Sequence, residues 1–135
     1  MKIKPMTRGD AQVIQSWTYL PPYDFYNQSS SEEGIEELMA YHAIYRDEEL
    51  IGFYCLGSFA QVPNSTYSYS ADYTDVGFGM RPDLTGQGNG RVFVEYVMSM
   101  AEKGKRPLRL TVASFNQRAI RLYEQVGFRT LTAFD

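Results

Sequence analysis

The feature that most constrains this chain is the run Gly86-Gln87-Gly88-Asn89-Gly90, in which every second residue is glycine. It follows a strand-like segment, residues 75–80, and precedes a segment with an apolar face at helical spacing, residues 91–103. Glycines free the backbone to adopt dihedrals that side chains forbid, and they let a ligand approach the main chain. Because the first turn of a helix has free N–H groups at its positive end, the run predicts an anion site.

Two common phosphate loops do not fit this run. A dinucleotide-binding fingerprint needs a glycine where Arg91 stands, and a Walker loop needs Gly-Lys-Ser/Thr, whereas Gly104-Lys105 is followed by Arg106. Two interpretations remain. Either the run is an anion loop of another kind, or its glycines merely permit tight packing of a helix N-terminus.

A second pattern follows in residues 110–128, which read as a strand, a turn, a helix and a glycine. Asn116, Ala119, Ile120 and Tyr123 recur at the spacing of one helix face. Asn116 and Tyr123 are thus two turns apart, about 10 Å along that face, so a long thin ligand can touch both. Taken alone, Asn116 is equally well a helix cap and Tyr123 a core aromatic residue.

Composition excludes several other classes of protein. The 135 residues suit one domain, 1–135, and 44% hydrophobic residues with 15% aromatic residues favour a folded core. A net charge of −3 makes binding to nucleic acid unexpected, because that needs a basic face. One Cys and one His leave no Cys-based or two-His metal site. The start of the chain, MKIKPMTRGD, has no apolar run of the kind a signal peptide needs, and the longest mostly apolar stretch, residues 50–57, is too short to span a membrane. We therefore expect no membrane partner and a cytoplasmic location.

Together, the two patterns resemble the two signatures of the GNAT superfamily of acyl-CoA N-acyltransferases. Thr85 to Gly90 fits the loop Arg/Gln-x-x-Gly-x-Gly/Ala at both small positions and departs at the first, so one phosphate contact is expected to be weaker. Asn116, Leu122-Tyr123-Glu124 and Gly127-Phe128 match the second signature. The resemblance implies an α+β fold, a twisted mixed sheet of about six strands flanked by about four helices. It also implies a V-shaped opening between the strands near 75–80 and 107–112.

The implied reaction moves an acetyl group from acetyl-CoA to a primary amine by direct attack in a ternary complex, without a metal. Tyr123 matches the general acid, the Met80 amide is the candidate donor to the oxyanion, and Asp75 is the candidate base. The acceptor side is expected at the aromatic residues Tyr23, Phe25 and Tyr26. The residues expected to bind acetyl-CoA are Phe78, Gly79, Met80, Thr85, Gly86, Gln87, Gly88, Asn89, Gly90, Arg91, Asn116, Ala119 and Tyr123.

Some alternatives stay open at this point. Asp75 is either the base or an ordinary acid at the end of a strand. The protein is either an active N-acetyltransferase or a catalytically weak CoA-binding module that acts as a sensor or partner subunit. The acceptor is a small-molecule or peptide amine that the sequence does not identify.

Assembly is predicted from the C-terminal segment. Residues 128–132 read as a closing strand, and only seven residues follow Phe128, so one side of this strand is expected to be unpaired. A homodimer that covers this edge is the first expectation. The alternative is a monomer in which the loop 62–70 shields the edge.

Overall fold

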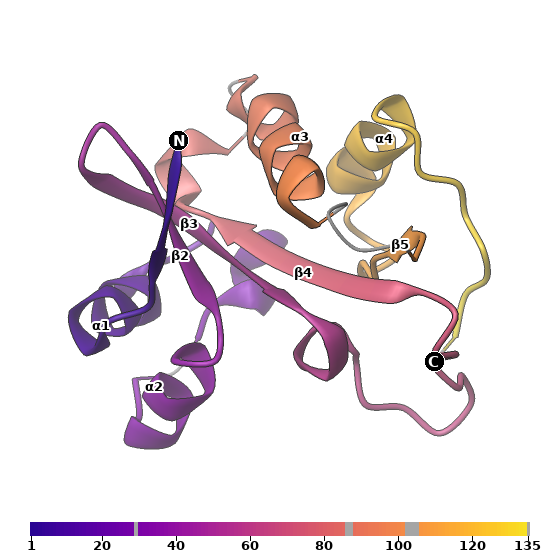
Figure 1. Ribbon diagram of the computed structural model, residues 1–135, viewed down its shortest axis with the longest axis horizontal. Helices are drawn as coiled ribbons and strands as arrows, with labels where there is room; N and C mark the ends of the chain where they lie inside the picture. Colours follow the sequence, from indigo (N-terminus) through magenta and orange to yellow (C-terminus); the bar gives the residue numbers. More distant parts are fainter. Residues whose placement is uncertain (29, 86–87, 102–105, 135) are drawn as a thin grey trace.

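One sheet of five strands, in the order β1-β2-β3-β4-β5, organises the chain (Figure 1). The computed structural model describes residues 1–28, 30–85, 88–101 and 106–134. Its strands are β1 Lys2–Pro5, β2 His42–Arg46, β3 Glu49–Leu56, β4 Thr74–Met80 and β5 Leu108–Arg109. Its α-helices are α1 Arg8–Ser16, α2 Glu32–Leu38, α3 Asn89–Ala101 and α4 Gln117–Gln125. Neighbouring strands from β1 to β4 are antiparallel, whereas β4 and β5 are parallel and α3 connects them, as the sequence predicts.

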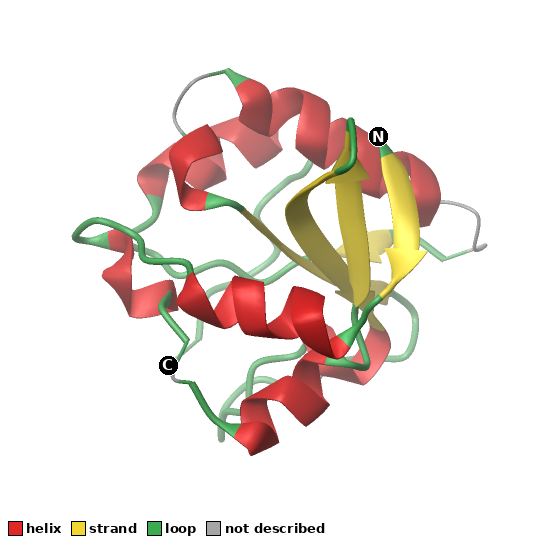
Figure 2. Cartoon of the chain, turned by 90° about the vertical axis from the view of Figure 1, so that its left-hand side faces the viewer, coloured by secondary structure: helices red, strands yellow, loops and turns green. Residues whose placement is uncertain are grey.

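Helices cover both faces of the sheet (Figure 2). Side chains of successive strand residues point to opposite faces, so Ala43 faces α1 and α2 while Ile44 faces α3. On the first face Ile14, Trp17 and Leu38 are buried together, and on the second Phe93 and Val97 are buried. The sheet is therefore the middle layer of three, with an apolar core on each side.

A capping box begins the first helix, α1. The Thr7 hydroxyl oxygen accepts a hydrogen bond from the Asp10 N–H at 3.0 Å, and the Asp10 carboxylate accepts one from the Thr7 N–H at 3.2 Å. This reciprocal pair satisfies two N–H groups at the N-terminal end of the helix. The helix ends at Ser16, and the segment after it leads into the loop that carries Tyr23, Phe25 and Tyr26.

The strands β4 and β5 separate soon after they pair. Their parallel register joins only Thr74 to Leu108 and Asp75 to Arg109. β4 then continues to Met80, while β5 ends at Arg109. In the described part of the chain no strand pairs with this edge of β4 beyond Asp75. This separation is the opening that the sequence predicts between the two strands.

The prediction of a closing strand in residues 128–132 is wrong. Residues 128–134 contain no strand, so the sheet has five strands instead of about six. The region outside β5 is already occupied by the loop before β4, whose Tyr69 hydroxyl lies 2.9 Å from the Thr111 hydroxyl. The C-terminal segment attaches through a side chain instead, because the Phe134 ring stacks on Tyr67 with centroids 5.0 Å apart. Because the closing strand is absent, the edge that this loop was expected to shield does not exist, and the loop packs beside β5 instead.

The described residues include neither a membrane-spanning helix nor a cluster of metal-ligating side chains. None of their helices is long and apolar enough to cross a membrane. They also contain no group of three or more His, Cys, Asp or Glu side chains placed to hold a metal ion.

Candidate active site

The free edge of β4 presents backbone groups that pair with no other strand in the described part of the chain. The Arg81 N–H donates to the Ile51 carbonyl at 2.8 Å, so the facing pair Gly52 and Met80 is the non-hydrogen-bonded kind. The N–H and C=O groups of Met80 therefore point away from β3, toward the opening. Because the pattern alternates, the same groups of Phe78 point there too. This edge can pair with the amides of an extended ligand.

The glycine-rich run leads directly into α3 beside this edge. Gly88 has φ +82°, a left-handed conformation that favours glycine, and a Cβ there would have nothing within 4 Å. Asn89, Gly90 and Arg91 form the first turn of α3, which begins two residues before the predicted start. Their N–H groups have no partner one turn earlier in the helix, which makes this end suitable for an anion. Gly86 and Gln87 lie outside the described residues.

Gly90 and Thr85 have local roles that the structure makes visible. A Cβ on Gly90 would come within 3.1 Å of Leu122 Cδ2, so the missing side chain lets α3 and α4 approach each other. The Thr85 hydroxyl donates to the Pro82 carbonyl at 2.7 Å. Thr85 thus closes the short 3₁₀ helix Pro82–Leu84 and places no cation near the turn.

Tyr123 lies on α4 against the same strand. Its ring meets Phe78 edge to face, with centroids 5.7 Å apart, and Phe128 at 6.2 Å. Burial, and to a lesser degree the nearby Tyr26, raises the pKa of the Tyr123 hydroxyl above its usual value. The hydroxyl is therefore protonated at neutral pH and available as a proton donor. The structure brings Tyr123 and the free edge of β4 together, as the resemblance implies.

Asn116 is the N-cap of α4. Its side-chain oxygen accepts from the Ala119 N–H at 3.2 Å, and its amide donates to the Tyr26 hydroxyl at 3.2 Å. The cap interpretation of Asn116 is thus correct, while a contact with a ligand stays a prediction. Ala119 is half-buried on the first turn of the same helix.

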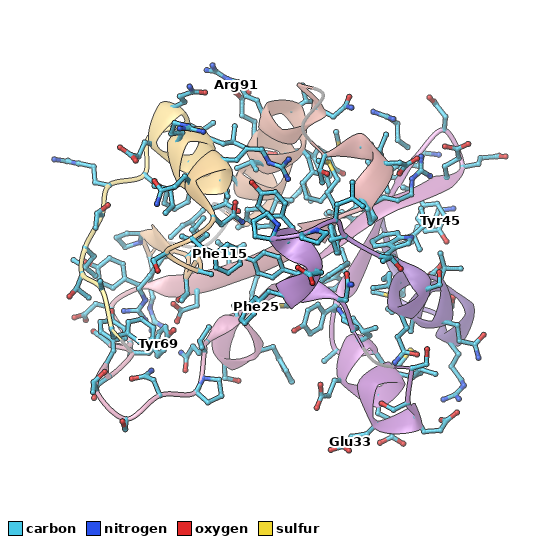
Figure 3. All side chains as sticks on the ribbon, turned by 180° about the vertical axis from the view of Figure 1, so that it is seen from behind. Phe25, Glu33, Tyr45, Tyr69, Arg91 and Phe115 are labelled. Atoms are coloured by element: carbon cyan, nitrogen blue, oxygen red, sulfur yellow. The ribbon has the colours of Figure 1, made fainter. Side chains whose placement is uncertain are left out.

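The aromatic loop after α1 lies against the connection between β5 and α4 (Figure 3). Phe25 meets Phe115 edge to face with centroids 5.5 Å apart, and Tyr26 lies 5.9 Å from Phe115. Tyr23 is oriented toward α4, where the Arg118 guanidinium lies 4.2 Å from its ring centre. Phe25 is 72% exposed and Phe115 41%, so these aromatic faces are open to a ligand. Phe115 was not among the predicted site residues, since only the fold brings it to Phe25.

A hydroxyl from this loop reaches the end of β4. Tyr19 donates a hydrogen bond of 2.7 Å to the Met80 carbonyl. Burial raises the pKa of Tyr19 to about 12, so this hydroxyl is neutral at neutral pH. Tyr19 is not among the site residues predicted from the sequence, because it lies 61 positions from Met80 and no spacing rule connects the two.

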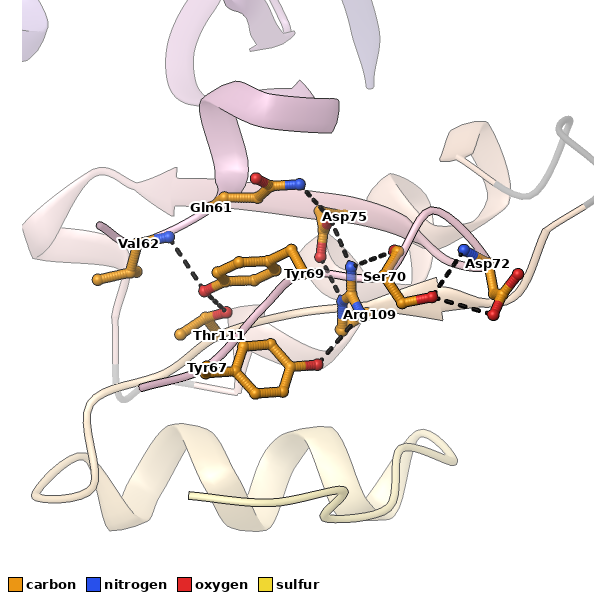
Figure 4. A network of polar contacts seen from close by, with 9 residues as sticks. All are labelled: Gln61, Val62, Tyr67, Tyr69, Ser70, Asp72, Asp75, Arg109 and Thr111. Atoms are coloured by element: carbon orange, nitrogen blue, oxygen red, sulfur yellow. Dashed lines mark hydrogen bonds and ion pairs between the residues drawn. The ribbon is translucent and has the colours of Figure 1, made fainter. Parts of the chain in front are cut away.

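Asp75 lies apart from this group of residues. The residue is 3% exposed. Its carboxylate accepts hydrogen bonds from Arg109 Nε at 2.6 Å, from Arg109 Nη2 at 3.0 Å and from the Gln61 side-chain amide at 3.0 Å (Figure 4). Asp75 is five residues before Met80 on an extended strand, about 16 Å away. The structure therefore does not bring Asp75 together with Met80 and Tyr123.

The Arg109 guanidinium also contacts the loop before β4. It also donates to the Tyr67 hydroxyl at 3.1 Å and to the Ser70 carbonyl at 2.8 Å, and it lies 5.0 Å from the centre of the Tyr69 ring (Figure 4). The bond to Asp75 is the main reason that the pKa of Arg109 is raised. This buried ion pair lies in the last register pair before β4 and β5 separate, so it fixes the point where the opening begins.

The class of protein follows from these observations. A split parallel strand pair, a free strand edge and a helix N-terminus beside it are features that suit an extended anionic ligand. Residues 9–128 match the family model described as Acetyltransferase (GNAT) family. The chain therefore belongs to the GNAT family, and it is an acyltransferase of that class. No curated protein sequence matches it significantly.

Solved acetyltransferases share the fold. AAC(6')-Ib, an aminoglycoside acetyltransferase solved with ribostamycin and coenzyme A, superposes with a TM-score of 0.73 at 15% identity, covering 94% of this chain and 82% of that one. The spermidine N-acetyltransferase chimera from Vibrio cholerae and hSSAT gives 0.68 at 19% identity, covering 98% and 82%. The ribosomal-protein-alanine N-acetyltransferase from Brucella melitensis gives 0.65 at 14%, covering 96% and 85%. At these identities the likeness is one of fold.

Proposed function

We propose that this protein transfers an acetyl group from acetyl-CoA to a primary amine by direct attack in a ternary complex. The observation that carries the proposal is the free edge of β4, where Phe78 packs against the ring of Tyr123 two residues before the strand ends at Met80. The edge suits the amides of the pantetheine arm, and the first turn of α3 suits the pyrophosphate. Crystals of GNAT-fold relatives with coenzyme A support this choice of co-substrate.

The proposed reaction uses two groups of the chain. The amine nitrogen attacks the thioester carbonyl carbon, and the carbonyl oxygen becomes an oxyanion that accepts a hydrogen bond from the Met80 N–H. The carbonyl then re-forms as the C–S bond breaks, and the thiolate takes the proton of the Tyr123 hydroxyl. The Tyr123 phenolate regains a proton from solvent, which restores the donor. The proton that the amine loses goes to solvent, because Asp75 is already bound by Arg109 and Gln61. Asp75 thus acts as a structural residue in this proposal, and the acceptor attacks as its free base.

The acceptor enters over the aromatic loop. Phe25 and Tyr26 form an exposed aromatic surface with Phe115, near Tyr123 and the end of β4. Aromatic faces attract cations and apolar groups, so they suit an alkylamine or the start of a peptide. Tyr23 belongs to the same loop and lines its side toward α4.

The experiment that tests this function measures CoA release from acetyl-CoA with a panel of primary amines, together with calorimetric acetyl-CoA binding. Release that depends on one class of amine supports the proposal. Binding without release supports the alternative, a CoA-binding sensor or partner module. One observation favours that alternative, because Thr85 stands at the loop position where the family has Arg or Gln.

We expect Gly88→Val to abolish acetyl-CoA binding while the fold is kept. A valine at φ +82° is strained by roughly 1 kcal/mol or more, and its methyl groups occupy the space in front of the α3 N-terminus. Calorimetry measures the affinity. The matched control is Gly57→Val, because Gly57 has φ +80°, open space around its Cβ, and a place outside this turn. Equal affinity in the two variants would remove the turn from the site.

The proposal extends to the whole chain. Residues 1–135 form one acyltransferase domain that works in the cytoplasm, which the buried free thiol of Cys55 fits. It acts as a homodimer, although the closing strand that first suggested this is absent. The remaining edge strand, β1, offers unpaired backbone groups for a second copy.

If the protein is a homodimer, light scattering at micromolar concentration should give a mass near twice the chain mass of 15.5 kDa. A mass of one chain would refute it. If a dimer forms, a proline in place of Ile3, in the middle of β1, should split it, because proline removes an N–H from the edge. A Leu131→Lys change should then leave the mass unaltered, since Leu131 is 60% exposed and lies outside any strand.

A further inference from the structure

The hydroxyl of Tyr19 occupies a special position at the end of the free edge of β4. It donates to the Met80 carbonyl at 2.7 Å, so it lies on the side of β4 where the Met80 N–H also points. The backbone of Tyr19 is fixed as well, because its N–H donates to the Asn27 side-chain oxygen at 2.7 Å. The side chain is half-buried. Tyr19 is thus held beside the proposed reaction centre from two directions.

The hydrogen-bond capacity of this hydroxyl decides what it can bind. A phenol has one O–H donor and two lone pairs that accept. The donor of Tyr19 is used by the Met80 carbonyl, so a ligand at this point meets only an acceptor. The matching ligand group is therefore an N–H or O–H donor. The Met80 carbonyl is occupied by the same bond, which leaves the Met80 N–H as the free backbone group at this end of the edge.

The protonation state excludes a role as base. Burial raises the pKa of Tyr19 to about 12, so the phenolate is scarcely populated at neutral pH. A neutral phenol oxygen accepts a hydrogen bond without removing the proton. Tyr123 has a different role in the proposed reaction, because its hydroxyl donates a proton to the leaving thiolate.

We propose that Tyr19 orients the attacking amine, by accepting a hydrogen bond from one of its N–H groups while the nitrogen lone pair faces the thioester carbon. This rests on the proposed function. A primary amine in its free-base form has two N–H groups and one lone pair, so one N–H can be held by Tyr19 while the lone pair attacks. Fixing the nucleophile in this way contributes proximity and orientation to the reaction. Tyr19 then belongs to the acceptor side of the site and makes no contact that acetyl-CoA needs.

The test compares Tyr19→Phe with a matched control, Tyr41→Phe. Tyr41 also has a half-buried hydroxyl that faces a backbone carbonyl, that of Phe59 at 3.5 Å, and it lies outside the site. The measurements are kcat/KM for the best amine of the panel, the calorimetric acetyl-CoA affinity, and acetyl-CoA hydrolysis without amine. Thermal unfolding confirms that both variants are folded.

We expect Tyr19→Phe to lower kcat/KM for the amine about ten-fold or more, while acetyl-CoA affinity and hydrolysis stay within about two-fold. Tyr41→Phe should alter none of them. An unchanged kcat/KM for the amine overturns the proposal. So does an equal loss of transfer and hydrolysis, because Tyr19 would then act on the strand or the thioester. A wild-type protein that acetylates no amine refutes the proposed function itself, which is a different outcome.

Discussion

Replacing Tyr123 with phenylalanine is expected to lower kcat by roughly 10²–10⁴, with little change in acetyl-CoA affinity. The substitution removes only the hydroxyl, so the ring still packs against Phe78 and Phe128. The departing thiolate then has no positioned proton donor and must wait for solvent. Because the pKa of Tyr123 is raised, the wild-type donor also stays protonated above neutral pH. Steady-state kinetics with the best amine and titration calorimetry measure the two effects.

The control for this change is Tyr54→Phe. Tyr54 is a buried tyrosine of β3 on the same face of the sheet as Phe78, and it has no place in the proposed chemistry. Removing the Tyr54 hydroxyl should leave kcat within about two-fold of the wild-type value. Wild-type turnover in Tyr123→Phe would show that solvent protonates the thiolate. A loss of acetyl-CoA affinity equal to the loss of kcat would show that the hydroxyl binds the co-substrate and takes no part in proton transfer.

Arg109→Met is expected to destabilise the fold by about 3–5 kcal/mol, a large share of the stability of a domain of this size. The change leaves the Asp75 carboxylate, 3% exposed, with the Gln61 amide as its remaining hydrogen-bond donor among the described residues. It also removes the bonds to Tyr67 and Ser70 that hold the loop before β4. Denaturant unfolding monitored by circular dichroism measures the loss.

A surface ion pair provides the contrast. Arg8 and Glu32 form an ion pair at 2.7 Å, but their side chains are 54% and 73% exposed. Arg8→Met should therefore lower the free energy of unfolding by at most about 1 kcal/mol. The double variant Asp75→Leu with Arg109→Met should recover part of the loss, because it leaves no buried charge without a partner. If Arg109→Met costs no more than Arg8→Met, the buried pair does not hold β4 and β5 together.

The local elements of this fold could be predicted from the sequence because their signals are local. Thr7 and Asp10 cap a helix three residues apart, and Asn116 caps another, so adjacent residues decide where these helices begin. Gly88, just before α3, acts through its own backbone, as its positive φ shows. The order strand, turn, helix, strand, helix in residues 74–125 follows from such signals, and it is the part that carries the family resemblance.

The tertiary structure alone decided which groups meet. The sequence offers Asp75 as a possible base, but only the pairing of β4 with β5 places Arg109 against it. It suggests a strand in residues 128–132, yet whether an apolar segment pairs depends on what already covers the neighbouring strand. The free N–H of Met80 and the hydroxyl of Tyr19 are set by strand register and by a contact across 61 residues. These outcomes depend on distant parts of the chain, because a residue's own type and spacing do not determine which partner the folded chain brings to it.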